Sequence, residues 1–124
     1  DRAYAYPVMK PHVRAEHFRP KMLWVGDSFS WNILYYLRGF RVSRDIEFLF
    51  YFKSRGHYGD GIRSSGLGRK RQPLDIPNFD WESSVFGKDV VVVEINEAAV
   101  SGIGMGFPQM LLEQLKGRSE VVKN

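Results

Sequence analysis

The stretch KMLWVG, residues 21–26, decides the fold, because it is a short and continuous apolar run that a glycine closes. A run without alternation is typical of a strand buried on both faces, as in parallel sheets. Residues 29–38, FSWNILYYLR, follow it and have the apolar spacing of an amphipathic helix. We therefore expect a strand, a tight turn and a helix, with Ser28 or Ser30 as the cap and Gly39 at the helix end.

Two further apolar runs predict strands. IEFLFYF, residues 46–52, is rich in β-branched and aromatic residues. DVVVVEI, residues 89–95, holds four consecutive valines, which favour a central position in a parallel sheet over an edge. Residues 53–88 between them predict a long glycine-rich loop, with a short helix at residues 81–86.

The remaining segments complete an α/β pattern. Residues 108–116 predict a closing helix, with Pro108 in its first turn and Gly117 at its C-terminal cap. Residues 1–20 carry three prolines and predict an irregular entry segment. The order of elements indicates one α/β domain over residues 1–124 with a mostly parallel sheet. A doubly wound sheet uses about five strands, so we expect this one to be incomplete.

Composition excludes several classes of protein. The chain has no cysteine, which rules out a disulfide scaffold, a thiol nucleophile and thiolate metal sites. Its three histidines have no zinc-like spacing, so we expect no metal and no cofactor. The chain contains no apolar run of about 18 residues, so we expect no transmembrane segment.

The positive charge is concentrated in one segment. The net charge is +4, and residues 53–72 hold six Lys or Arg against Asp60 alone, a local balance of +5. Such a patch attracts an anionic polysaccharide, nucleic acid or an acidic membrane surface, and the alternative is a solvated loop. No nucleic-acid-binding motif accompanies the patch, which disfavours nucleic acid as a partner.

The tripeptide Gly26-Asp27-Ser28 stands directly between the first strand and the first helix. Ligands of open α/β sheets bind outside the carboxyl ends of the strands. Ser28 there can act as a nucleophile, while the free N–H groups of the helix start form part of an oxyanion hole. Gly26 allows the tight turn, and Asp27 can hold it by hydrogen-bonding backbone amides. The alternative is that Asp27 and Ser28 only cap the helix.

Two blocks of the sequence carry a family resemblance. LWVGDSFSWNILYYL, residues 23–37, resembles the first block of the SGNH (GDSL) hydrolase superfamily, and its Gly-Asp-Ser-Phe-Ser form resembles the SGNH-like domains of alginate-type polysaccharide O-acetyltransferases. DVVVVEINE, residues 89–97, is similar to a later strand of those domains. The resemblance covers roughly residues 21–38 and 89–98, about a quarter of the chain. The resemblance implies a flavodoxin-like three-layer sandwich and an extracytoplasmic setting, periplasmic or secreted.

The resemblance also assigns roles to residues. Ser28 matches the nucleophile, and its own backbone N–H would serve the oxyanion hole. Asn96 lies where the superfamily places an oxyanion donor, although the glycine expected two positions before it is Glu94 here. The alternative for Asn96 is a turn residue that satisfies local backbone groups. Glu94 is a candidate perturbed carboxylate, which can equally pair with a base such as Lys21 or Arg55.

The general base is the open question. The superfamily usually places an Asp-His pair near the C-terminus, but no histidine follows Glu97. In the alginate-type enzymes the pair precedes the serine by a long interval, so we expect it upstream of Asp1. Within the chain, His57 oriented by Asp60 is the internal candidate, and an exposed loop histidine is the alternative. His12 and His17 precede the first strand and would start from the opposite end of the sheet.

These observations predict serine-dependent acyl transfer through an acyl-Ser28 intermediate. By resemblance the acceptor is a polysaccharide hydroxyl, and a membrane-bound partner is the source of acyl groups. An esterase of the same fold is an alternative, because the acyl-enzyme is common to both. A polysaccharide-binding module without catalysis is another, as no Asp-His pair is present. The weakest alternative is a phosphate or nucleotide binder that uses Gly26–Ser30 as an anion-binding loop, since no glycine-rich phosphate motif follows the strand.

Overall fold

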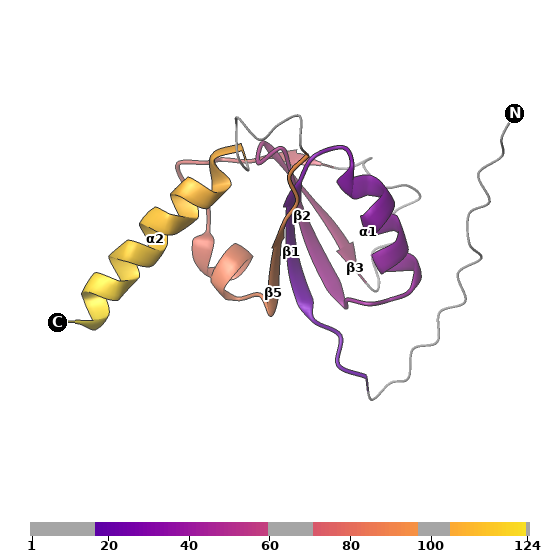
Figure 1. Cartoon of the computed structure of the whole chain (residues 1–124), viewed down its shortest axis with the longest axis horizontal. Coiled ribbons are helices and arrows are strands. Elements are labelled where there is room, and N and C mark those ends of the chain that lie inside the picture. Colours follow the sequence, from indigo (N-terminus) through magenta and orange to yellow (C-terminus); the bar gives the residue numbers. More distant parts are fainter. Residues whose placement is uncertain (1–16, 60–70, 97–104, 124) are drawn as a thin grey trace, which may run out of the picture.

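The computed structural model describes residues 17–59, 71–96 and 105–123, and Figure 1 shows their arrangement. A five-stranded sheet has the order β4-β3-β2-β1-β5. Its strands are β1 (Lys21–Gly26), β2 (Asp45–Phe50), β3 (Ser54–Gly59), β4 (Gln72–Pro73) and β5 (Val90–Val93). The helices are α1 (Ser30–Gly39), the π-helical η1 (Glu82–Phe86) and α2 (Phe107–Val122).

The three strands expected from the sequence lie side by side and run parallel. β1 pairs with β2 on one side and β5 on the other, with Val25 opposite both Leu49 and Val93. Val25 and Leu23 are fully buried. The continuous apolar run of β1 therefore correctly indicated a strand covered on both faces.

The sheet as a whole is mixed, so the predicted mostly parallel flavodoxin-like three-layer sandwich is wrong. β3 pairs antiparallel with β2, and β4 pairs antiparallel with β3. The reason is a tight turn, in which Lys53 N donates to Phe50 O at 3.1 Å. Its two central residues, Tyr51 and Phe52, have φ values of 53° and 50°. Positive φ at both positions reverses the chain into a hairpin instead of a crossover.

The long segment 53–88 is consequently not the open loop that its glycines and prolines predict. It contains β3, β4 and η1, in addition to residues 60–70, which lie outside the described residues. The expected short helix at residues 81–86 is confirmed, and Gly87 N donates to Glu82 O at 2.7 Å across a widened π-type turn.

β5 lies at an edge of the sheet, which corrects the central position predicted from its four valines. Val90 and Val91 keep 39% and 38% of their surface exposed. Among the described residues, β5 pairs with a single strand, β1. An apolar strand that would suit a central position thus has one neighbour within the described ranges.

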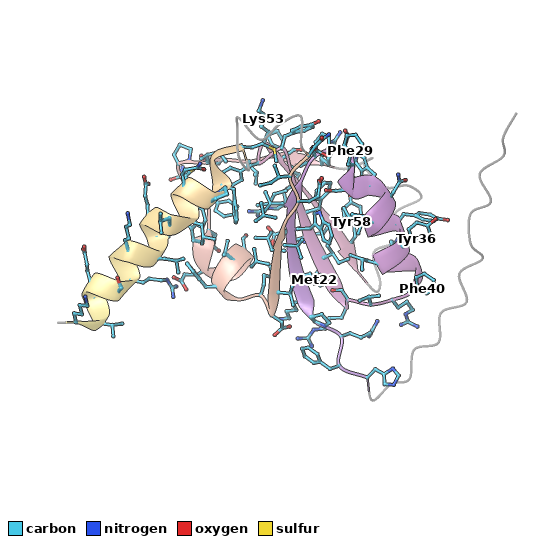
Figure 2. The ribbon with its side chains drawn as sticks, in the orientation of Figure 1. Met22, Phe29, Tyr36, Phe40, Lys53 and Tyr58 are labelled. Atoms are coloured by element: carbon cyan, nitrogen blue, oxygen red, sulfur yellow. The ribbon has the colours of Figure 1, made fainter. Side chains whose placement is uncertain are left out.

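The two faces of the sheet carry separate cores. Toward α1, Leu34 packs with Tyr58 and with the even-numbered apolar residues of β1 and β2, which are Met22, Trp24, Ile46 and Phe48. Figure 2 shows Tyr58 on this side of the sheet. Toward η1 and the start of α2, Phe52 and Phe107 pack with the odd-numbered apolar residues of β1 and β2. The alternation of side chains along each strand explains this division.

The helices differ from their predicted limits in two ways. α1 begins at Ser30 after Phe29, and no side chain caps it, so neither expected serine cap forms. α2 continues through Gly117 to Val122, although a glycine was expected to end it. A glycine inside a helix costs about 1 kcal/mol relative to alanine, which the helix tolerates here. In the described ranges, no helix combines the length and apolar character needed to cross a membrane.

Candidate active site

The Gly26-Asp27-Ser28 turn lies where β1 ends and α1 begins. Ser28 is exposed, whereas Asp27 is only 5% exposed. Asp27 Oδ1 accepts a hydrogen bond from Phe29 N at 2.7 Å, which closes an Asx-turn around Ser28. Asp27 therefore stabilises the turn and is not an N-cap of α1.

Glu94, just beyond β5, holds the same turn from the neighbouring strand. Its Oε2 accepts from Asp27 N at 3.2 Å and from Ser30 Oγ at 2.8 Å. Trp24 Nε1 in turn donates to Ser30 Oγ at 2.9 Å. The chain of hydrogen bonds ties β1, the start of α1 and the end of β5 together, and thereby fixes the backbone on both sides of Ser28.

Gly26 is required by this close packing. A Cβ at Gly26 would overlap Ser30 Oγ and lie 2.8 Å from Glu94 Oε2. Real Cβ atoms do not approach other atoms so closely, so any side chain at Gly26 would displace the Ser30–Glu94 hydrogen bond. The sequence analysis assigned Gly26 to the tight turn, and the structure adds the close approach of Glu94.

The electrostatic setting of Ser28 combines both signs of charge. α1 begins at Ser30, so the positive end of its dipole lies next to the turn, while the carboxylates of Asp27 and Glu94 lie on either side of Ser28 in the chain of hydrogen bonds. The backbone N–H groups of Asp27, Phe29 and Ser30 are taken up by Glu94 Oε2, Asp27 Oδ1 and Asp27 O, respectively. The assignment of the Ser28 N–H to an oxyanion hole remains a prediction.

His57 is not brought to Ser28. It is exposed on β3, opposite Glu47, which in turn is opposite Leu23 of β1. The backbone of His57 therefore lies about 10 Å below the edge that carries Ser28 and two strands away from it. Its side chain shares a face with Glu47, on the side of η1, whereas the turn leads into α1 on the other face.

The other proposed base residues give no alternative within the described ranges. Asp60 and His12 lie outside the described residues. His17 is exposed and precedes β1, at the amino end of the strand. The described part of the chain thus places no histidine beside Ser28.

Asn96 lies beyond β5 at the same edge as Ser28, two residues after Glu94, and is half-buried. Its place at this edge agrees with the sequence analysis, and its role as an oxyanion donor remains a prediction. Glu94 pairs with neither Lys21 nor Arg55. The side chain of Arg55 instead contacts Glu47, with Nε 2.9 Å from Oε1.

Aromatic side chains flank the turn. Phe29 is 63% exposed, and Figure 2 shows it with Lys53 at the edge where β1 and β2 end. Tyr51 is 38% exposed and is fixed beside the turn, because its N–H donates to Gly26 O at 2.8 Å. Arg71, from the predicted basic segment, lies over the ring of Phe50, 4.1 Å from its centroid.

A buried ionic cluster lies on the opposite face of the sheet. Glu47 is 2% exposed and contacts Arg55 and Lys88, each at 2.9 Å. Ser84 Oγ of η1 also donates to Glu47 Oε1 at 3.0 Å. The cluster joins β2, β3 and η1 and is distant from Ser28, so we interpret it as structural.

Sequence reasoning named the exposed serine, Ser30 as a possible cap and Glu94 as a candidate perturbed carboxylate, but it missed the hydrogen bonds that join them. It also missed Trp24, which belongs to the predicted strand and donates to Ser30 Oγ. The signal that could have identified Glu94 is an acidic residue directly after a buried valine run, because it must find a hydrogen-bond donor at the sheet edge.

Among the described residues, no group of three or more His, Asp or Glu is placed to hold a metal ion.

The chain matches no family model, no curated protein and no solved structure. The resemblance to the SGNH superfamily therefore rests on the residues quoted above and remains a prediction.

Proposed function

We propose that the protein is a serine acyltransferase that forms an acyl-Ser28 intermediate. Ser28 Oγ bonds to the carbonyl carbon of an acyl ester, and the leaving group departs with the serine proton. A sugar hydroxyl then attacks the acyl-serine, forms the new ester and returns a proton to Ser28. The observation that carries the proposal is an exposed serine at a helix start, in a turn held by Asp27 and Glu94.

The proposal requires a general base, and no described histidine lies beside Ser28. A serine at its ordinary pKa is a weak nucleophile, so a base has to remove its proton. The resemblance implies an Asp-His pair in this role. The same resemblance implies a polysaccharide acceptor, an extracytoplasmic setting and a membrane-bound source of acyl groups.

The exposed aromatic residues support a carbohydrate acceptor. Phe29 and Tyr51 offer exposed flat apolar surfaces close to the turn, where the face of a sugar ring can pack. The exposure of Ser28 also favours water as an acceptor, which would make the protein an esterase. Transfer and hydrolysis share the first step and differ in the second.

A second candidate is a polysaccharide-binding module without catalysis. It is favoured by the distance of His57 from Ser28, which leaves the serine without a described activator. In this role the turn would be a structural element, and the exposed aromatic side chains would bind the polymer.

Labelling of the intact chain with a serine-directed fluorophosphonate, followed by peptide mass mapping, tests the proposal. We expect the label on Ser28, its loss in Ser28→Ala and its retention in Ser119→Ala. Ser119 is a matched control, because it is an exposed serine on a helix flank away from the sheet edge. Equal labelling of Ser28→Ala and wild type would overturn the proposal. The same labelling is done on a version extended at the N-terminus, because the Asp-His pair is expected there. The absence of any label on both versions would favour the binding module.

A further inference from the structure

The outer part of α2 is unusual because it has little of the protein to pack against. Every residue from Leu112 to Lys123 is exposed, and Figure 1 shows this part of the helix extending away from the sheet. Its contact with η1 is made by Arg118, which pairs with Glu82 and lies 3.6 Å from the centroid of the Phe86 ring. An isolated helix of about 12 residues is only marginally stable in water, so a packing partner would stabilise it.

A row of three apolar residues and one serine, called here the apolar row, runs along one exposed flank of this part of the helix. Its members, spaced by three, four and three residues, are Leu112, Leu115, Ser119 and Val122. The spacing places them on one stripe, as in the seam of a helix pair. The exposed fractions of Leu112, Leu115 and Val122 are 52%, 47% and 86%. Three large apolar side chains on one exposed stripe indicate a contact surface.

A charged row lies directly beside the apolar row. Each of its members directly follows a member of the apolar row in the sequence. They are Glu113, Lys116, Glu120 and Lys123. The signs alternate along the helix as minus, plus, minus, plus. Within the described ranges, none of these four side chains takes part in an ion pair. The row is therefore available to charges on a partner.

We propose that these two rows form a contact between two copies of this chain, with the α2 helices antiparallel. A two-fold axis across the helix pair brings the same row of each copy together in reverse order. Glu113 then lies near Lys123 of the second copy, and Lys116 lies near its Glu120. In the apolar row, Leu112 lies near the second copy's Val122. Ser119, a small residue near the centre of the row, allows close approach of the helices.

The charge order selects this arrangement over the others. In a parallel pair the two charged rows would lie on opposite sides of the seam, so they would not meet and their charges would add nothing to the contact. An alternating row is self-complementary only when it is reversed, which is the property of an isologous antiparallel contact.

The size of the surface predicts a weak dimer. About three turns of helix bury less than the roughly 1,200 Å² that typical specific complexes bury, so we expect a micromolar dissociation constant. Sedimentation equilibrium from about 1 µM to 1 mM covers this range. We expect a monomer–dimer equilibrium that shifts toward monomer at high salt.

Charge variants of the full chain test the arrangement. Glu113→Lys with Glu120→Lys makes the row entirely basic, and Lys116→Glu with Lys123→Glu makes it entirely acidic. Each variant alone should be monomeric, and an equimolar mixture should restore the dimer. Because all four positions are exposed, circular dichroism should show unchanged folding.

The matched control reverses all four charges in one chain. This variant keeps the net charge and the alternating order, so it should dimerise as the wild type does. The proposal is overturned if the wild type stays monomeric to about 1 mM. It is also overturned if the all-basic variant dimerises as strongly as the wild type, or if the mixture of the two variants stays monomeric.

Discussion

Glu94 Oε2 accepts a hydrogen bond from Ser30 Oγ at 2.8 Å, which joins the residue after β5 to the first residue of α1. The same oxygen accepts from Asp27 N, on the other side of Ser28. The exposed Ser28 therefore lies between two residues, Asp27 and Ser30, that Glu94 holds in place. A nucleophile needs such a fixed position, because reaction depends on the geometry of approach.

Replacement of Glu94 should weaken both the fold and the turn. Glu94→Ala leaves Ser30 Oγ and Asp27 N without this acceptor, so we expect the free energy of unfolding to fall by about 1–3 kcal/mol. Glu94→Gln keeps one acceptor oxygen and should lose less. Urea unfolding measures both variants, and fluorophosphonate labelling of Ser28 should slow in Glu94→Ala. An alanine variant as stable as wild type would contradict the assigned role.

Replacement of Glu47 should be more costly. Glu47→Ala removes the 2.9 Å partner of Lys88, whose side chain is 9% exposed, and leaves Lys88 Nζ with the more distant Asp45 Oδ2 at 3.9 Å. Removal of one member of a buried ion pair typically costs about 3–5 kcal/mol. Urea unfolding measures the loss, and Asp75→Ala, at an exposed acidic residue, is the control. A loss at Glu47 no larger than that at Asp75 would show that the cluster does not stabilise the fold.

The hairpin turn between β2 and β3 offers a stabilising substitution. Tyr51 is partly exposed with φ of 53°, a left-handed conformation that asparagine adopts more readily. Tyr51→Asn should raise the free energy of unfolding by about 1 kcal/mol in thermal or urea unfolding. Phe52 has a similar φ but packs against Phe107, so Phe52→Ala should lower stability instead. A less stable Tyr51→Asn variant would mean that the tyrosine side chain outweighs the strain.

Asp80 should make stability depend on pH in the acid range. Hydrogen bonds from Ser83, by its hydroxyl and then its backbone N–H, hold the pKa of Asp80 below its usual value of 3.8. Its contribution is therefore fully present above pH 3.8 and is lost as the pH falls through the lower, folded-state pKa. Carboxyl NMR titration should show a lowered pKa, and Ser83→Ala should return it toward the usual value. An unchanged Asp80 titration in Ser83→Ala would refute the cause.

The sequence predicted the parallel centre of the sheet and the location of the serine. Continuous apolar runs specify β1, β2 and β5 locally, and a strand–turn–helix succession places Ser28 at the sheet edge. The hairpin could not be predicted, because Tyr51 and Phe52 are not residues that favour positive φ. β3, SRGHYG, also lacks an apolar run, since it is stabilised by pairing with β2 and by Arg55–Glu47.

The edge position of β5 and the role of Glu94 depend on tertiary arrangement. Four valines favour burial, but sequence does not say whether a further strand covers them. Glu94 is fixed by Ser30, 64 residues earlier in the chain, and no local pattern reports that distance.

The most direct test of the central claim is the mass of an acyl-enzyme. The intact chain is incubated with p-nitrophenyl acetate, quenched with acid, digested and mapped by mass spectrometry. The account predicts one acetyl ester on Ser28 that is absent from Ser28→Ala and remains in Ser119→Ala. Acetyl groups found only on lysines, or the same ester release by Ser28→Ala and wild type, would contradict it.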